Sequence, residues 1–482
     1  MNKRIILYIL GWVLIIEGFA MQIATVTSFI YGEHEGLYFL GTGAVSVLLG
    51  VLAVKVKKPQ NMVLYQKAGF AATGLSWIVM SLVGCMPFWL SGEIPSFIDA
   101  FFETVSGFTT TGSTILKDVE ALSHCMLIWR SFLNWLGGMG VIVFLLAIIP
   151  KLGGQQNIYL MKAESPGPIV GKALPRMRSY AALLYGIYIG LTVLEIILLL
   201  CGGMNVFDAL NTSFATAGTG GFGTYNSNMA AYDSYYLQMV IAVFMMLFGI
   251  NFTVYILILA RKFKSAFKIE ELWVYLGVIA VCTLLIAINI SSLYPTPYDS
   301  FHQSFFYVSS IITTTGFGIS DVNQWPAFSQ ALILIITFVG AMAGSTGGGF
   351  KISRIILLFK ELMKEIALLV HPRNIKSVKM DGKSIDHSIM RTTSVYLVLY
   401  ILIFFASYLI IALENLDFTT TFTSVAATLN NTGPGFSMVG STGNYSEFSV
   451  FSKIVFCFNM LAGRLELYPL LLIFIPPAWK KN

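Results

Sequence analysis

Long apolar runs dominate the chain and are separated by short polar segments. The runs 36–54, 68–90, 236–260 and 272–290 are each 19 residues or longer and contain no Asp, Glu, Lys or Arg. Six further apolar stretches, some with an embedded charge such as Glu17 or Arg130, are 5–28, 126–150, 180–202, 327–350, 392–413 and 454–476. A helix needs about 20 apolar residues to cross the hydrocarbon core of a bilayer. The pattern predicts an all-α integral membrane protein with ten transmembrane crossings.

Composition places the chain in the same class. Of its 482 residues, 56% are hydrophobic and 11% are charged, whereas soluble proteins carry about 25% charged residues. The five cysteines are scattered in or beside apolar stretches, and no two of them have metal-binding spacing. We expect neither a disulfide framework nor a metal site. Because no small-residue cleavage pattern follows Lys3 and Arg4, the first apolar run is expected to be a retained helix.

The basic residues lie mainly in every second connection between the predicted crossings, as membrane topology requires. If the N-terminus is cytoplasmic, the cytoplasmic segments hold 26 of the 30 Lys and Arg residues; these segments are 1–4, 55–67, 151–179, 261–271, 351–391 and 478–482. Basic residues are enriched in the cytoplasmic loops of membrane proteins. We therefore expect a multi-pass plasma-membrane protein with both termini cytoplasmic. The net charge of +6 reflects this topology rather than binding to nucleic acid.

A helix–loop–helix unit recurs four times along the chain. Each outer connection contains a moderately apolar run that is too short to cross the membrane, and each run ends in a Thr-Gly pair. The four pairs are Thr111-Gly112, Thr219-Gly220, Thr315-Gly316 and Thr432-Gly433. We predict helix–pore-loop–helix units at 68–150, 180–260, 272–370 and 392–477, arranged around a pseudo-fourfold pore. Residues 1–57 are predicted to form an additional N-terminal pair of transmembrane helices.

Four such loops at membrane depth suit an ion-selectivity filter. Irregular backbone inside a membrane has to line water or be buried in protein, and glycine permits backbone angles that point successive carbonyl oxygens the same way. A ring of these oxygens replaces the hydration shell of a monovalent cation. The expected binding residues for a potassium ion are Thr110, Thr111, Gly112, Thr219, Gly220, Thr314, Thr315, Gly316, Asn431, Thr432 and Gly433. The alternative is a set of solvated Gly/Thr loops on the outer surface.

These repeats resemble those of the Trk/Ktr/HKT superfamily of cation transporters, and the additional helix pair and long cytoplasmic segments resemble its TrkH branch. The resemblance covers essentially the whole chain. It implies a potassium-translocating subunit of a bacterial plasma membrane that forms a homodimer and binds a cytosolic, nucleotide-sensing ring of TrkA type. In the superfamily, glycine at the first filter position accompanies potassium selectivity, and this chain has Gly112 there. The fourth loop departs from the pattern at Asn431 and Pro434.

A glycine run interrupts the second helix of the third unit. Five of the ten residues at 340–349 are glycine, and each costs a helix about 1 kcal/mol relative to alanine. We expect an unwound segment just below the filter. The resemblance implies an intramembrane gate here, with gate residues Gly344, Gly347, Gly348, Gly349 and Lys351. The alternative is a kinked helix that packs closely through its small residues.

Arg464 lies near the middle of the last predicted crossing. A lone arginine there costs about 2.5–3.5 kcal/mol on insertion scales, so its side chain should face protein or water. The resemblance implies that Arg464 lines the pore beneath the filter and contacts the gating loop. We therefore expect an electrostatic barrier that steadies the closed gate. The alternative is a structural ion pair, for example with Glu195.

Other function classes are poorly supported. The G-x-G-x-x-G match at 218–223 lies between membrane helices, and the glycine-rich segment 344–351 departs from the P-loop pattern, so we expect no cofactor site and no enzyme activity in this chain. A proton- or sodium-coupled potassium symporter is the main alternative, because transporters also use broken helices at the midplane. The channel-like subunit of a potassium-pumping ATPase is a second. The basic segment 351–391 is expected to dock a partner or to bind anionic lipid.

Overall fold

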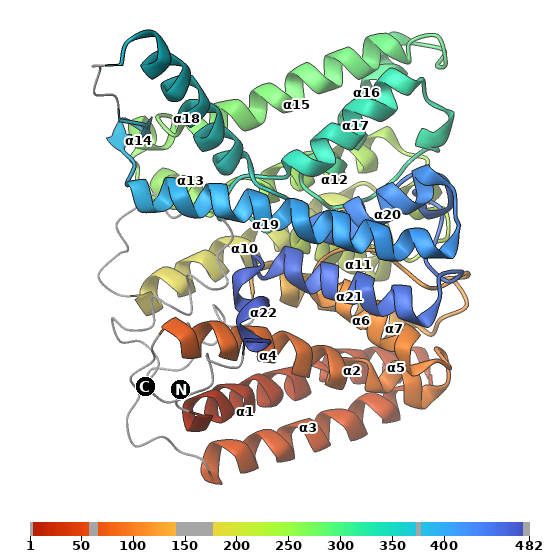
Figure 1. Ribbon diagram of the computed structural model, residues 1–482. Helices are drawn as coiled ribbons and strands as arrows, with labels where there is room; N and C mark the ends of the chain where they lie inside the picture. Colours follow the sequence, from red (N-terminus) through yellow and green to blue (C-terminus); the bar gives the residue numbers. More distant parts are fainter. Residues whose placement is uncertain (1–2, 57–65, 141–176, 373–376, 476–482) are drawn as a thin grey trace.

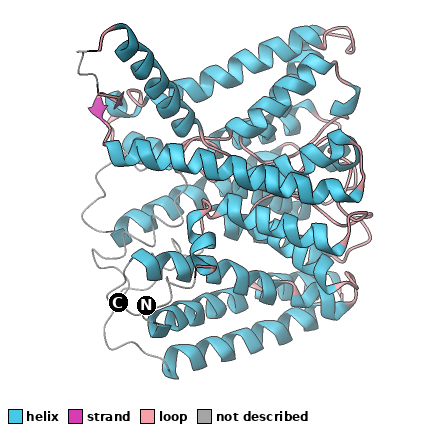
Figure 2. Cartoon of the chain, in the orientation of Figure 1, coloured by secondary structure: helices cyan, strands magenta, loops and turns pink. Residues whose placement is uncertain are grey.

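The computed structural model describes residues 3–56, 66–140, 177–372 and 377–475. Within these ranges almost every element is a helix, and the only strands are β1 (Lys379–Met380) and β2 (Lys383–Ser384), which pair antiparallel. Most of the long helices lie side by side in one common direction (Figure 1), and Figure 2 shows how little of the described chain is strand. The all-α architecture predicted from the apolar runs is confirmed.

The N-terminal helices form a closely packed pair. Helices α1 (Lys3–Ala20) and α2 (Gln22–Tyr31) make one apolar span, and α3 (Gly36–Val56) makes the next. The pair meets at glycines, since a Cβ placed on Gly11 would lie 2.9 Å from the carbonyl oxygen of Gly50, and one on Gly18 would lie 2.6 Å from that of Gly43. Small residues let membrane helices approach closely in this way.

Four sets of helices follow. The first contains α4 (Gln66–Gly84), α5 (Met86–Ser91), α6 (Phe97–Phe108) and α7 (His124–Gly138); the second contains α10 (Met177–Cys201), α11 (Val206–Gly218), η3 (Asn228–Ala231), α12 (Tyr235–Phe248) and α13 (Phe252–Leu259). After α14 (Phe263–Ala266), the third contains α15 (Glu270–Asn289), α16 (Pro297–Ile312), η4 (Val322–Gln324), α17 (Ala327–Val339) and α18 (Ile352–Val370). The fourth contains α19 (His387–Ile411), η5 (Ala412–Glu414), α20 (Phe418–Asn430), η6 (Ser437–Val439), α21 (Val450–Arg464) and α22 (Tyr468–Ile473).

The short helices α6, α11, α16 and α20 begin in the same way. In each, the side chain of the residue before the helix accepts a hydrogen bond from the backbone N–H three residues on; the capping residues are Ser96, Asn205, Thr296 and Asp417. Such a cap satisfies an N–H group that has no partner within the helix. These four helices, called pore helices below after their predicted role, therefore start at fixed positions, and their C-terminal residues are buried.

The second long helix is interrupted in the second, third and fourth sets, whereas the sequence predicted an interruption only in the third. Among the described residues, six helices are long and apolar enough to cross a membrane, and the bent pair α12 and α13, whose axes differ by 89°, would make a seventh. Helix α7 ends at Gly138, α17 at Val339 and α21 at Arg464. The breaks occur where the backbone meets the end of a pore helix: a Cβ on Gly137 would lie 1.8 Å from the carbonyl oxygen of Phe108.

Large apolar side chains point outward along the unbroken helices. Leu48, Ile197, Leu284 and Leu402 are all exposed, and they lie on α3, α10, α15 and α19, respectively. Exposed apolar faces of this extent are unusual in soluble monomers. They fit a surface that faces the hydrocarbon of a bilayer, as expected of a multi-pass membrane protein.

The loop between α2 and α3 caps the start of α7. Glu33 accepts hydrogen bonds from the backbone N–H groups of His124 at 2.7 Å and Cys125 at 3.0 Å, at the start of α7. A carboxylate at a helix N-terminus is stabilised by the unpaired N–H groups and the helix dipole. Partial burial disfavours its charge, yet these N–H groups outweigh burial and hold the pKa of Glu33 below its ordinary value.

Some predicted features fall outside the described residues. These are the unit boundaries at 57, 150 and 477 and most of the segment 151–179. The boundaries of the four units therefore stay predictions.

Candidate functional site

Four turns with the same backbone follow the four pore helices. Each has a non-glycine residue with positive φ, followed two residues later by a glycine with positive φ. The first set is Thr110 (54°), Thr219 (55°), Thr314 (59°) and Asn431 (56°); the second is Gly112 (80°), Gly221 (71°), Gly316 (82°) and Gly433 (91°). L-residues with side chains rarely adopt these angles. The shared pattern identifies the equivalent positions of the four turns.

In the second turn this equivalence corrects the sequence alignment. Gly221, and not Gly220, is the counterpart of Gly112, because Thr219 has the backbone conformation of Thr110. Gly220 therefore occupies the middle position, where the first unit has Thr111. The Thr-Gly pair pointed to Gly220 because Gly220 and Gly221 are adjacent. Nothing in the sequence distinguishes two adjacent glycines.

The four glycines form a closed ring. A Cβ placed on each would collide with the carbonyl oxygen of the middle residue in the next unit. These approaches are Gly112 to Gly220 at 2.2 Å, Gly221 to Thr315 at 2.0 Å, Gly316 to Thr432 at 2.2 Å, and Gly433 to Thr111 at 2.4 Å. Only glycine fits such an approach. The four turns thus surround one axis in the order of the sequence.

An outer cavity opens directly onto this ring. All four ring glycines line it, together with loop residues that include Asn226, Ser441 and Tyr445. The pore helices end at the inner side of the turns, where their unpaired carbonyl groups carry partial negative charge. A cation in the ring would therefore meet carbonyl oxygens from four directions and the negative ends of four helix dipoles.

A buried ion pair supports the first turn from behind. Nε of Arg130 on α7 lies 2.8 Å from Oε1 of Glu103 on α6, and Glu103 also accepts a hydrogen bond from the hydroxyl of Thr114 at 3.0 Å. The guanidinium of Arg130 continues to the second unit, where it donates to the carbonyl oxygen of Gly223 at 3.3 Å and lies 4.2 Å from the ring centre of Phe222. The side chain of Arg130 thus links the segments that follow the first and second turns.

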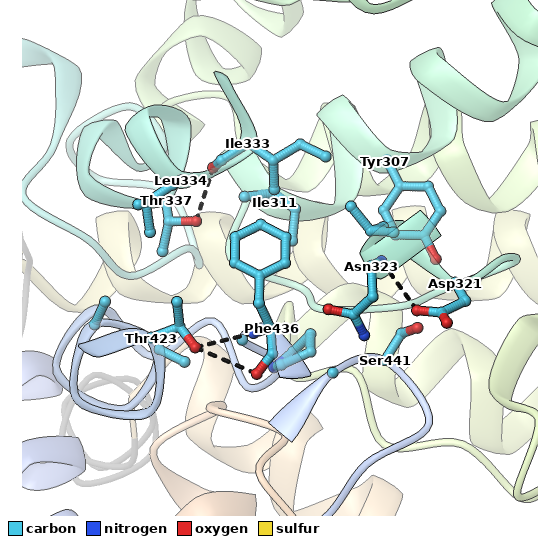
Figure 3. Close-up of a pocket in the computed structure, with 16 residues that line it drawn as sticks. Tyr307, Ile311, Asp321, Asn323, Ile333, Leu334, Thr337, Thr423, Phe436 and Ser441 are labelled. Carbon is cyan, nitrogen blue, oxygen red and sulfur yellow. Dashed lines mark hydrogen bonds between the residues drawn. The ribbon is translucent and has the colours of Figure 1, made fainter. Parts of the chain in front are cut away.

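A second, smaller cavity lies behind the fourth turn, between α16, α17 and α20 (Figure 3). The ring of Phe436 lies beside Ile311 in this cavity. Thr423 holds the segment in place, since its hydroxyl accepts a hydrogen bond from the N–H of Phe436 at 2.9 Å. None of the four ring glycines lines this cavity. The outer cavity, and not this one, continues the axis of the ring.

The glycine-rich segment is unwound and lies against the inner side of the ring. No helix covers residues 340–350, and Gly340, Gly344 and Gly349 have positive φ. Gly348 donates its N–H to the hydroxyl of Thr314 at 2.6 Å, and a Cβ on it would lie 2.4 Å from the carbonyl oxygen of Asn430. The glycine loop therefore contacts the turns of the third and fourth units directly below the ring.

The loop also contacts the helix break of the second unit. The N–H of Met342 donates to the carbonyl oxygen of Gly249 at 3.2 Å, and the hydroxyl of Thr346 donates to that of Phe248 at 3.2 Å. In return, Phe252 donates its N–H to the carbonyl oxygen of Gly344 at 3.1 Å. These three bonds fasten the loop to the gap between α12 and α13.

Arg464 joins the loop to the first unit. It is the last residue of α21, at a helix break rather than inside a continuous crossing. Its guanidinium donates to the carbonyl oxygens of Thr346, Gly137 and Gly138, each at 2.6 Å. All three of these acceptors are backbone carbonyl oxygens. Through Arg464, the glycine loop is in contact with all four units.

Lys351 and Glu271 hold the ends of the loop. Lys351 is buried, has a φ of 80°, and donates from Nζ to the carbonyl oxygen of Gly347. On α15, Oε1 of Glu271 accepts hydrogen bonds from the N–H groups of Ala343 at 2.7 Å and Ser353 at 3.1 Å. Sequence reasoning missed Glu271, because an acidic residue in the first turn of a helix is ordinary and its partners lie 72 and 82 residues away.

Two basic residues of the expected docking segment 351–391, Lys351 and Arg354, are buried in this region. Arg354 is buried and forms an ion pair with Glu466 of the fourth unit, and its guanidinium lies 3.9 Å from the ring centre of Tyr396. It is therefore part of the packing between the third and fourth units. Lys360 and Lys364, six and ten residues later on α18, remain partly exposed and pair with Glu270 and Glu361, respectively.

Comparisons with known proteins agree with this architecture. The TrkH family, described as a cation transport protein, matches residues 37–481. The Trk system potassium uptake protein TrkH of Escherichia coli K12 is 36% identical over 490 residues and covers 100% of both chains. The Trk system potassium uptake protein TrkG of the same organism is 33% identical and covers 99% of both. The crystal structure of the potassium transporter TrkH from Vibrio parahaemolyticus matches with a TM-score of 0.90 and 31% identity, over 100% of both chains.

These matches run from end to end at more than 30% identity, and the family match spans most of the sequence. They confirm the expected likeness to the TrkH branch and the expectation of a transporter rather than an enzyme. The chain belongs to the TrkH family of cation transport proteins.

Proposed function

We propose that this chain mediates potassium uptake across the bacterial plasma membrane through a channel-like pore. The observation that carries the proposal is the closed ring, in which the glycine of each unit lies against a carbonyl oxygen of the next. Such a ring of oxygens replaces the hydration shell of a cation. The names of the relatives, which refer to potassium uptake, support potassium as the transported substrate.

The filter consists of three consecutive residues from each unit. They are Thr110, Thr111 and Gly112; Thr219, Gly220 and Gly221; Thr314, Thr315 and Gly316; and Asn431, Thr432 and Gly433. An ion enters from the outer cavity, passes the ring glycines and reaches the threonine level. Potassium is the substrate of this site, and no cofactor in this chain takes part.

The glycine loop acts as the gate. Its backbone lies below the filter and contacts the third and fourth turns, which is where an ion leaving the filter would pass. Gly344 and Gly349, with positive φ, act as pivots, whereas Gly347 and Gly348 bring the backbone close to the filter. Lys351 and Arg464 hold the loop closed through its carbonyl oxygens, and Arg464 adds positive charge to the exit.

The proposal extends to the arrangement in the cell. Both termini are cytoplasmic, in line with the basic residues of the predicted cytoplasmic segments. Two copies form a homodimer, and a nucleotide-binding ring of TrkA type binds from the cytoplasm. Helix α18, which projects from the helical array in Figure 1 and exposes Phe359 and Leu369, supports a partner surface on that side.

The test is uptake of isotopic rubidium into liposomes that contain the purified chain and a potassium gradient. We expect uptake that runs down this gradient, is inhibited by potassium more than by sodium, and loses that preference in Gly112→Ser. Uptake that requires a proton or sodium gradient would instead identify a coupled symporter. If the wild-type chain shows no preference for potassium under any gradient, the proposal is wrong.

A further inference from the structure

The second filter turn lacks side chains that the other turns carry. The middle filter position holds threonine in three units and glycine in one; the residues are Thr111, Gly220, Thr315 and Thr432. In the first and third units its hydroxyl bonds to a threonine hydroxyl two residues earlier, and the pairs are Thr109 with Thr111 and Thr313 with Thr315, each at 2.8 Å. The second unit has Gly218 at this earlier position, so its turn contains neither hydroxyl.

Asn134 of the first unit occupies the space behind this turn. A Cβ on Gly220 would lie 2.2 Å from Cγ, 2.4 Å from Nδ2 and 2.6 Å from Oδ1 of Asn134. A Cβ on Gly218 would lie 2.2 Å from the backbone oxygen of the same residue. Neither glycine can take a side chain while α7 stays in place. The two glycines and Asn134 are therefore complementary in shape across the boundary between two units.

Hydrogen bonding does not explain the position of the Asn134 amide. The side chain is fully buried, and among the described residues neither its oxygen nor its nitrogen has a hydrogen-bond partner. Burying an unpaired amide costs free energy that an apolar side chain of the same size would avoid. One helical turn earlier on α7, Arg130 contacts Phe222 and Gly223 of the same strand. The face of α7 that carries Arg130 and Asn134 thus lies along residues 218–223 of the second unit.

We propose that Asn134 is a positioning residue for the filter. Its side chain supports the second turn from the first unit, in the place where pairs of threonine hydroxyls bond to each other in the first and third turns, and it thereby sets the preference of the ring for potassium over sodium. The proposal rests on the proposed function of the ring. It explains why the second turn is rich in glycine: the turn leaves room for Asn134, which lies 86 positions before Gly220 in the chain.

Exchanging the two side chains tests the proposal. Gly220→Thr alone should reduce rubidium uptake and potassium preference by about tenfold, because overpacking forces the backbone to shift. Asn134→Ala alone should lower the preference, since the turn loses its support. The double variant should recover most of both, because Asn134→Ala removes all three atoms that would lie nearest to the new Cβ.

Two controls make the exchange specific. Gly218→Ala should not be rescued by Asn134→Ala, because its collision is with the backbone oxygen of residue 134. Gly186→Ala, on α10 with open space around it, should behave as wild type. If Gly220→Thr does not fold, Gly220→Ser enters the same cycle, and recovery of folded protein by Asn134→Ala then counts as rescue.

The outcomes separate this inference from the proposed function. Wild-type uptake without potassium preference would overturn the proposed function itself. If the wild type is selective, a double variant no better than the worse single variant overturns the role of Asn134. Full wild-type preference in Gly220→Thr would do the same. Rescue in the double variant, together with failure of rescue at Gly218, supports it.

Discussion

The carboxylate of Glu271 accepts a hydrogen bond from the backbone N–H of Ala343, with 2.7 Å between Oε1 and the nitrogen. The same oxygen accepts the N–H of Ser353, beyond the other end of the glycine loop. One carboxylate on α15 therefore fixes the separation of the two ends of the proposed gate. If the loop opens by moving away from the filter, these two bonds resist the movement.

Replacing Glu271 with glutamine should loosen the gate. The substitution keeps the shape of the side chain and removes its charge, and hydrogen bonds to charged groups contribute about 1.5–3 kcal/mol each. We expect rubidium efflux from loaded liposomes to rise by about tenfold, the factor that corresponds to 1.4 kcal/mol. Glu270→Gln is the matched control, because Glu270 pairs with Lys360 rather than with the loop. Equal efflux from both variants would remove Glu271 from the gate.

Replacing Arg464 with alanine should raise leak flux further. The substitution removes three hydrogen bonds to Thr346, Gly137 and Gly138, together with the positive charge below the filter. Arg464→Lys should give an intermediate leak, because lysine keeps the charge but not the fork that reaches three carbonyl groups. The readout is rubidium efflux from liposomes with protein that elutes as a single species. Wild-type flux from intact Arg464→Ala protein would contradict the gate role.

Gly221 should be as sensitive as Gly112. A Cβ at Gly221 would lie 2.0 Å from the carbonyl oxygen of Thr315, and its φ of 71° is unfavourable for alanine. Left-handed backbone costs about 1–2 kcal/mol for an L-residue, and the collision adds to it. We expect Gly221→Ala to lose potassium-selective uptake as Gly112→Ala does, measured by sodium and potassium competition. A selective Gly221→Ala variant would show that the ring alignment is wrong.

Glu33 should stabilise the protein in a pH-dependent way. Because its folded-state pKa is lowered by the N–H groups of His124 and Cys125, its contribution is present above the ordinary pKa of about 4.3 and is lost as pH falls through the lower value. Glu33→Gln should cost about 1 kcal/mol at pH 7, as for loss of a helix cap. Thermal unfolding in detergent at pH 7 and at pH 3 measures the difference, which should shrink at pH 3.

Glu35→Gln is the control for this measurement, since it removes a charge from the same loop without removing the cap. A loss of stability in Glu33→Gln that stays constant across this pH range would show that packing, and not the charge of the carboxylate, holds the start of α7.

The sequence predicts the long helices and the four loops because both are local. Uncharged runs such as 272–290 correspond closely to α15, and the glycine run correctly indicated an unwound segment. The equivalent glycine of the second turn could not be chosen from local sequence. The close approach of Gly221 to the carbonyl oxygen of Thr315 identifies it, and this approach exists only in the closed ring.

The helix breaks show the same limit. The break after Arg464 has positive φ at Glu466 and Leu467, residues whose side chains disfavour it, and nothing in their sequence signals a turn. The chain adopts these angles because the helix has met the end of α20 in its own unit, where a Cβ on Gly463 would lie 2.1 Å from the carbonyl oxygen of Leu429. Tertiary contacts, rather than local preference, end the helix.

A single polypeptide closes the ring of Gly112, Gly221, Gly316 and Gly433. In an assembly of four identical subunits, every inherited change would enter all quadrants at once. Here a mutation alters one quadrant and leaves three intact, so the quadrants diverge independently over evolutionary time. Two of the four units differ from the others in this way: the second has Gly220 beside Asn134, and the fourth has Asn431. A ring closed by one chain therefore has a freedom to become asymmetric that a ring in a homotetramer lacks.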